Sequence, residues 1–86
     1  MGEIEVAINS IPEVTNAACI FDQPNDKIVL YYTTTDGQEL DIINLVKDKI
    51  PVYMFPEVIN MLKVMPYNMN GKIDRIELKK MYEAAN

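Results

Sequence analysis

Hydrophobic positions at the start of the chain have a helical spacing. Ile4, Ala7, Ile8 and Ile11 stand at i, i+3, i+4 and i+7, which would place them on one face of an α-helix. Pro12 cannot continue a helix because it lacks the backbone N–H, so the pattern predicts a short helix that ends before it.

Two strands are predicted next. The segment "NAACIF" is largely apolar, and "KIVLYYTTT" is dense in β-branched and aromatic residues, as β-strands are. Between them, "DQPND" is rich in the Asp, Asn and Pro that favour turns. The three segments together predict a hairpin.

A second helix is predicted from about residue 42 to residue 50, before Pro51. Asp41 can cap its first turn, and Leu40 and Leu45 flank the cap at the positions of a hydrophobic staple. The apolar stripe that would lie on a sheet consists of Ile42, Leu45, Val46 and either Lys49 or Ile50.

The remaining elements are a strand and a helix. The segment "EVINMLKV" has apolar residues on both faces, which is typical of a central or covered strand. Asp74 and Glu77 form a D-x-x-E capping pattern ahead of a helix with apolar positions Leu78, Met81, Tyr82 and Ala85. The sequence therefore predicts a small α+β domain, in which a sheet of about three main strands, with a hairpin, packs against three short helices.

Size, composition and charge narrow the functional classes. The 86 residues suffice for one domain, and the formal net charge of -5 argues against nucleic acid as a partner, since phosphate binding needs clustered Lys and Arg. The apolar runs are too short to span a membrane, and the acidic N-terminus does not resemble a signal peptide. With only one cysteine, the chain fits a reducing compartment, and we expect a cytoplasmic protein without a membrane partner.

Several kinds of site are not expected. The chain has no histidine, which argues against a metal centre or a His-dependent catalytic triad. Cys19, without a histidine to activate it, is predicted to lie in the core. The acids Glu3 and Glu5 are interpreted as solvated surface residues because a spacing of two separates them around a helix.

Aromatic and methionine residues suggest one contact surface. Met61, Met65 and Met81 fit core positions. Tyr53, Met54 and Phe55, by contrast, lie between two prolines, where a regular element could hardly bury all three. We interpret these three residues as an exposed group that could face a partner.

One lysine follows a strong turn signal. Asn70 and Gly71 readily adopt positive φ, so they can form a tight turn that directs the side chain of Lys72 outward. No glycine-rich phosphate loop precedes the lysine. Taken alone, "NGK" indicates an ordinary exposed lysine on a turn, because a match of three residues recurs by accident.

Longer motifs surround this lysine. The chain contains "IPVYMFP" and "MPYNMNGKIDRIEL" and, near its start, "GEIE" followed by "IPEVTNAACI". These motifs resemble the "LPxYMxP", the "LPxTxNGKxDRxxL" and the opening motifs of the C-terminal subdomain of the adenylate-forming enzymes, which include acyl-CoA synthetases and amino-acid adenylation domains. Met65 and Asn68 stand where the family usually has Leu and Thr. The "NGKIDR" segment is most similar to peptide-synthetase adenylation domains and carrier-protein ligases.

The resemblance implies roles for single residues. Lys72 would be the catalytic lysine that promotes attack of a carboxylate on the α-phosphorus of ATP. Asn70 and Gly71 would shape its loop, Asp74 would cap the final helix, and Arg75 would anchor locally or act at a domain interface.

The resemblance also implies missing parts. Residues 1–86 would be the C-terminal lid subdomain of an AMP-forming acid–thiol ligase, inactive alone, because the large N-terminal domain that binds ATP with Mg and the acyl substrate is absent. The thiol acceptor would be phosphopantetheine on a carrier protein, or coenzyme A. The alternative is a free-standing, non-catalytic interaction module of the same fold that binds a carrier protein or another partner. The acyl or amino-acid substrate stays open.

Overall fold

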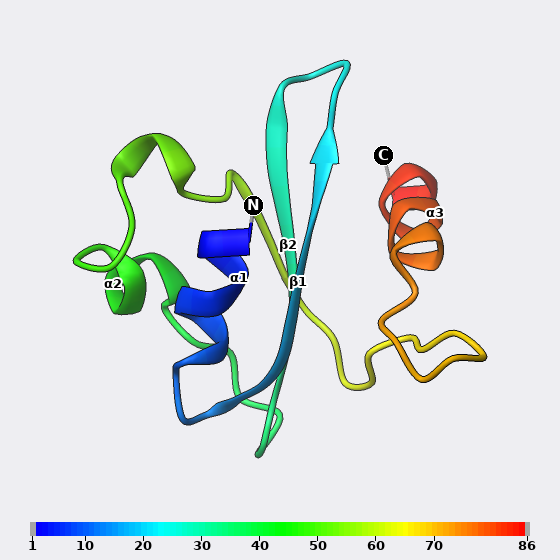
Figure 1. Ribbon diagram of the computed structural model, residues 1–86, viewed down its shortest axis with the longest axis horizontal. Helices are drawn as coiled ribbons and strands as arrows, with labels where there is room; N and C mark the ends of the chain where they lie inside the picture. The colour runs from blue at the N-terminus through cyan, green and yellow to red at the C-terminus, as the bar shows by residue number, and fades with distance from the viewer. Residues whose placement is uncertain (1, 86) are drawn as a thin grey trace.

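The helices and strands follow the order predicted from the sequence (Figure 1). The computed structural model describes residues 2–85. Its elements are α1 (Gly2–Asn9), β1 (Val14–Asp22), β2 (Lys27–Thr34), α2 (Ile42–Val46), the short 3-10 helix η1 (Val52–Met54), β3 (Val58–Met61) and α3 (Arg75–Ala85). The predicted α+β class, with three strands and three helices, is confirmed. Among the described residues, no helix is long and apolar enough to cross a membrane.

The three strands form one mixed sheet in the order β1-β2-β3. β1 and β2 make the predicted antiparallel hairpin, and β3 pairs with β2 in parallel, from Val29 opposite Val58 to Tyr32 opposite Met61. The central strand is therefore β2. Of the two predicted alternatives for the third strand, central or covered, the structure shows the second: β3 is an edge strand with core residues on both faces. β3 is apolar on both sides because Val58 and Met61 pack into different layers of the core; the pattern reports which faces are covered, not the position in the sheet.

Both faces of the sheet are covered by helices (Figure 1). α1 and α2 lie on one side and α3 on the other. Successive side chains of a strand point to opposite faces, so Cys19 and Leu30 join the core under α1 and α2, whereas Ala18 and Val29 join the core under α3. This arrangement makes the middle of both hairpin strands buried without interruption.

The second helix is shorter than predicted. Asp41 caps it, since its side chain accepts a hydrogen bond from the backbone N–H of Asn44. The helix ends at Val46, where the backbone N–H groups of Lys49 and Ile50 both donate to the Val46 carbonyl, at 2.9 and 3.2 Å. Ile42, Val46 and Ile50 are buried, but Leu45 is 40% exposed, so its predicted place in the buried stripe was wrong.

The burial of α1 predicts a contrast between two substitutions on the same helix. Ile8 is fully buried, whereas Val6 is 71% exposed. Ile8→Ala should lower the free energy of unfolding by about 2–5 kcal/mol, because it removes buried carbon and leaves a cavity. Val6→Ala should change it by no more than about 0.5 kcal/mol. Urea titration followed by circular dichroism measures both; equal losses would contradict the assigned orientation of α1.

Candidate functional site

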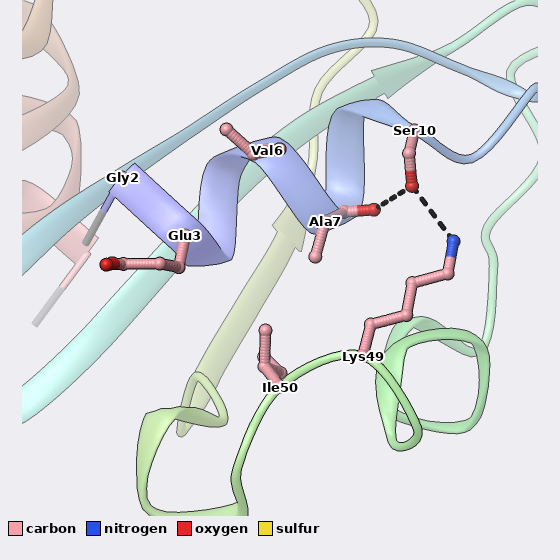
Figure 2. Close-up of a pocket in the computed structure, with 7 residues that line it drawn as sticks. All are labelled: Gly2, Glu3, Val6, Ala7, Ser10, Lys49 and Ile50. Atoms are coloured by element: carbon pink, nitrogen blue, oxygen red, sulfur yellow. Dashed lines mark hydrogen bonds between the residues drawn. The ribbon is translucent and has the colours of Figure 1, made fainter.

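An open groove lies between α1 and the segment after α2 (Figure 2). It has a volume of about 700 Å³ and is lined by Gly2, Glu3, Val6, Ala7, Ser10, Lys49 and Ile50. The Nζ atom of Lys49 donates to Ser10 Oγ at 2.9 Å, and Ser10 Oγ donates to the Ala7 carbonyl at 2.6 Å. Lys49 and Ser10 are thus hydrogen-bonded to each other and to the backbone of α1.

The Asn-Gly-Lys segment lies elsewhere, on the loop that joins β3 to α3. We call residues 66–73 the lysine loop. Its two ends approach each other through a bridge between Tyr67 and Ile73, and the backbone N–H of Asn68 donates to the Lys72 carbonyl at 2.8 Å. Asn16 of β1 donates a hydrogen bond to the Tyr67 hydroxyl, so the loop is also fastened to the sheet.

Asn68 organises the tip of this loop. Its side-chain oxygen accepts hydrogen bonds from the backbone N–H groups of Asn70, at 2.9 Å, and Lys72, at 3.1 Å. Its backbone carbonyl accepts from the N–H of Gly71 at 3.0 Å. Gly71 has φ +76°, a conformation that glycine adopts without steric cost. Sequence reasoning treated Asn68 only as a departure from a motif, although Asn commonly bonds the backbone two residues ahead.

Lys72 is presented to solvent by this loop. Its side chain is exposed, and within residues 2–85 no carboxylate forms an ion pair with it. The described residues also contain no cluster of three or more potential metal ligands. The loop therefore holds the backbone of Lys72 firmly, while its ammonium group stays available to an anion from outside.

The helix that follows the loop is attached at both ends. At its start, Asp74 Oδ1 accepts from the backbone N–H of Glu77 at 3.0 Å, and the Asp74 N–H donates to the Pro66 carbonyl at 2.9 Å. Near its C-terminal end, the Tyr82 hydroxyl donates to Asp22 Oδ2 at 2.6 Å. The capped first turn thus begins directly where the lysine loop ends.

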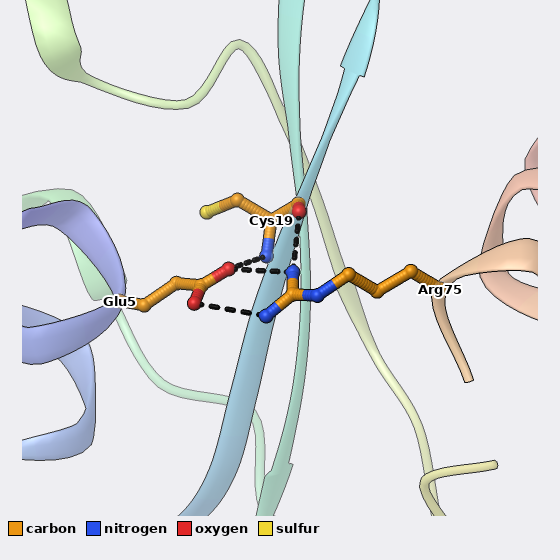
Figure 3. A network of polar contacts seen from close by, with 3 residues as sticks. All are labelled: Glu5, Cys19 and Arg75. Atoms are coloured by element: carbon orange, nitrogen blue, oxygen red, sulfur yellow. Dashed lines mark hydrogen bonds and ion pairs between the residues drawn. The ribbon is translucent and has the colours of Figure 1, made fainter. Parts of the chain in front are cut away.

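Arg75, in the first turn of α3, joins three elements (Figure 3). Its guanidinium donates to both carboxylate oxygens of Glu5 on α1, at 2.7 and 3.0 Å, and to the Cys19 carbonyl on β1 at 2.8 Å. Glu5 Oε2 also accepts from the Cys19 N–H at 2.8 Å. Glu5 is half-buried, so its interpretation as a solvated surface acid was wrong; a partner 70 residues away leaves no local signal.

The contacts of this network shift three pKa values. Burial alone would raise the pKa of Glu5, but hydrogen bonds from Arg75 and from the Cys19 N–H outweigh it and lower that pKa. The hydrogen bond to Glu5 raises the pKa of Arg75. Burial, followed by the nearby Glu5 carboxylate, raises the pKa of the Cys19 thiol to about 12. Cys19 is buried as predicted and is therefore a core residue without a reactive thiolate.

The group expected to be exposed between two prolines is divided. Tyr53 is 82% exposed, and its neighbour Val52, which the sequence did not single out, is 77% exposed. Met54 and Phe55 are only half-exposed and pack against the core under α1 and α2. The exposed surface thus consists of Val52 and Tyr53 at the start of η1, whereas the chain turns back toward the core at Met54 and Phe55.

A three-stranded sheet covered by helices on both faces (Figure 1), with a lysine loop ahead of the final helix, is the arrangement of the C-terminal domain of adenylate-forming enzymes. Residues 3–72 match the family described as the AMP-binding enzyme C-terminal domain. The chain belongs to that family, and the resemblance based on its motifs is confirmed.

Individual relatives agree. A dimodular nonribosomal peptide synthase from Bacillus subtilis strain 168 is 35% identical over 87% of this chain, which spans 3% of that protein. The anguibactin system regulator of Vibrio anguillarum is 33% identical over 94% of the chain, which spans 9% of that protein. Among solved structures, Klebsiella oxytoca NpsA in complex with 3-hydroxyanthranilyl-AMSN has a TM-score of 0.81 and 29% identity, with 92% of this chain and 16% of that chain covered. The chain therefore corresponds to a small part of each relative.

The Glu5–Arg75 pair predicts a pH dependence of stability. Because the pKa of Glu5 is lower in the folded chain, its contribution is fully present above the unfolded pKa and is lost as the pH falls through the folded pKa. Glu5→Gln should cost about 1–2 kcal/mol of unfolding free energy at neutral pH, and this difference should shrink as the pH falls below about 4. Urea titrations over that range provide the measurement.

Glu3→Gln is the matched control for this prediction, because Glu3 is exposed on the same helix. It should leave the stability at neutral pH nearly unchanged. If Glu5→Gln and Glu3→Gln behaved alike at every pH, the Arg75 network would not contribute to folding.

The raised pKa of Cys19 predicts a thiol that is unreactive in the folded chain. At mildly alkaline pH, a group with a pKa of about 12 is almost entirely protonated, and the thiolate is the form that attacks disulfides. An aromatic disulfide reagent should therefore label Cys19 only as fast as the chain unfolds, and at once in denaturant. Rapid labelling of the native chain, measured by absorbance, would contradict both its burial and its pKa.

Proposed function

We propose that this chain is the lid subdomain of an adenylate-forming ligase and that Lys72 is its catalytic lysine. The observation that carries the proposal is the lysine loop, in which hydrogen bonds fix the backbone of Lys72 while its ammonium group stays exposed and without an acidic partner among the described residues. Membership of the AMP-binding C-terminal family supports it. A large N-terminal domain would hold ATP, Mg and the acyl substrate.

Lys72 would act by bringing two anions together. In the first half-reaction, a carboxylate oxygen attacks the α-phosphorus of ATP, and pyrophosphate leaves with the electrons of the broken P–O bond. Like charges repel strongly in a site that excludes water. An ammonium group between the carboxylate and the phosphate lowers that repulsion and stabilises the charge that develops in the transition state. The product is an enzyme-bound acyl-adenylate.

The second half-reaction requires the lysine to withdraw. A thiol, from phosphopantetheine on a carrier protein or from coenzyme A, would attack the acyl carbon, and AMP would leave. The lysine loop is fastened to β1 through Asn16 and to α3 through Asp74, so the loop would move with the whole subdomain. Rotation of such a rigid body is a common way to change an active site between steps.

Substitution of Lys72 tests this proposal in the ligase formed by the chain and its N-terminal domain. Lys72→Ala should lower ATP–pyrophosphate exchange by roughly 10²–10³-fold, the usual effect of removing one group that stabilises transition-state charge. The isolated 86-residue chain should give no exchange. Lys80→Ala, which removes another exposed lysine, should exchange at the wild-type rate. Exchange by Lys72→Ala equal to that of Lys80→Ala would remove Lys72 from the reaction.

A second candidate function is supported by Val52 and Tyr53, which are exposed side by side on η1. Exposed apolar groups of this kind can form the centre of a protein contact. The chain would then be a free-standing module that binds a carrier protein or another partner. Calorimetric titration with carrier protein in the absence of nucleotide distinguishes the two: binding that Tyr53→Ser abolishes supports the module, and no binding favours the ligase.

A further inference from the structure

We propose that Asn70 is a site of spontaneous covalent modification, at which the side-chain amide is lost through a succinimide and replaced by a carboxylate. Asn70–Gly71 is the only Asn-Gly pair in the sequence. The modification itself follows from the Asn-Gly pair, its rate in the folded chain depends on the geometry of the lysine loop, and neither rests on the proposed function. Its consequence for activity rests on the proposed function of Lys72.

The reaction needs an accessible amide and an unhindered backbone nitrogen. Asn70 is exposed. Gly71 has no side chain that could hinder approach to its backbone nitrogen, and the space where a Cβ would stand has no atom within 4 Å. That nitrogen attacks the side-chain carbon Cγ of Asn70 and loses its proton, and the Asn70 Nδ2 leaves as ammonia. Water then opens the five-membered ring at either carbonyl, which yields aspartate or isoaspartate.

The hydrogen bonds of Asn68 control this reaction. The Gly71 N–H, whose proton must leave, donates to the Asn68 backbone carbonyl at 3.0 Å. The N–H groups of Asn70 and Lys72 donate to the Asn68 side-chain oxygen at 2.9 and 3.1 Å. These bonds keep the nitrogen occupied and the turn closed. Ring closure therefore requires the tip of the lysine loop to open, and Asn68 sets how often that happens.

The products would disable the loop that presents Lys72. Either product places a carboxylate two residues before the lysine, where it competes with the anions that the lysine would bind. Isoaspartate, in addition, inserts the Cβ atom of residue 70 into the main chain. The longer backbone cannot keep both N–H groups, those of residue 70 and Lys72, on the one side-chain oxygen of Asn68.

Ageing the purified chain tests the modification directly. During incubation in mildly alkaline buffer, intact-mass measurement should show a gain of one mass unit, since NH₂ is replaced by OH, and peptide mapping should place it at residue 70. Asn68→Ala should accelerate this gain roughly three- to tenfold, because it removes two hydrogen bonds that hold the loop closed. Asn70→Gln should abolish it, because a longer side chain closes its ring far more slowly.

Two controls keep the result interpretable. Asn9, which precedes Ser10 at the end of α1, should stay unmodified on the same map, and circular dichroism should show that Asn68→Ala is folded. The wild-type chain in denaturant should react faster than the folded chain. No gain at residue 70, or equal rates for folded wild type, Asn68→Ala and denatured chain, would overturn the proposal.

Activity is measured separately, in the ligase formed with the N-terminal domain. The fraction of ATP–pyrophosphate exchange lost on ageing should equal the fraction modified at residue 70, and Asn70→Gln should not lose activity with age. Modification without loss of exchange would contradict the stated consequence while leaving the modification established. If Lys72→Ala left the exchange rate of the unaged ligase unchanged, that result would contradict the proposed function but not the modification of Asn70.

Discussion

The structure depends on the way Arg75 and Glu5 bind the backbone of Cys19 at the free edge of β1. An edge strand exposes backbone groups that no neighbouring strand satisfies. Here the Arg75 guanidinium donates a hydrogen bond to the Cys19 carbonyl, and the Glu5 carboxylate accepts one from the Cys19 N–H. Arg75 and Glu5 are also joined to each other by two hydrogen bonds. One side-chain pair thereby connects the first helix, the first strand and the last helix. The paired charges are acceptable in a half-buried position because nearly every polar atom has a partner.

This network positions the lysine loop. The loop runs from β3 to α3, and its end is fixed because α3 begins with a capped turn that carries Arg75. Asn16 holds the loop from the other side through Tyr67. Leu78 then buries α3 against the sheet. Lys72 is thus an exposed charge on a hydrogen-bonded loop, which suits the role proposed for it, in which it enters and leaves a site formed by another domain.

Local patterns predicted much of this structure. The spacing of Ile4 and Ile8, the hairpin composition and the Asp74 cap are each contained within a few residues, so α1, the β1–β2 hairpin and α3 could be recognised in the sequence. The edge position of β3, the early end of α2 and the partner of Glu5 depend on contacts between distant segments. At the candidate site, the motif predicted Lys72, which the structure places exposed on the lysine loop. Asn68, which closes the loop, was not predicted, because the motif drew attention to the residues after it.

Under the proposed function, the subdomain brings Lys72 to the acid-activating step and then withdraws it. The two half-reactions can be separated in the ligase formed with the N-terminal domain, by following pyrophosphate release in one assay and transfer from a preformed acyl-adenylate to thiol in another. The account predicts that Lys72→Ala loses most of the first rate and keeps the second near that of the wild type. Equal losses in both half-reactions, or loss of thiol transfer alone, would contradict it.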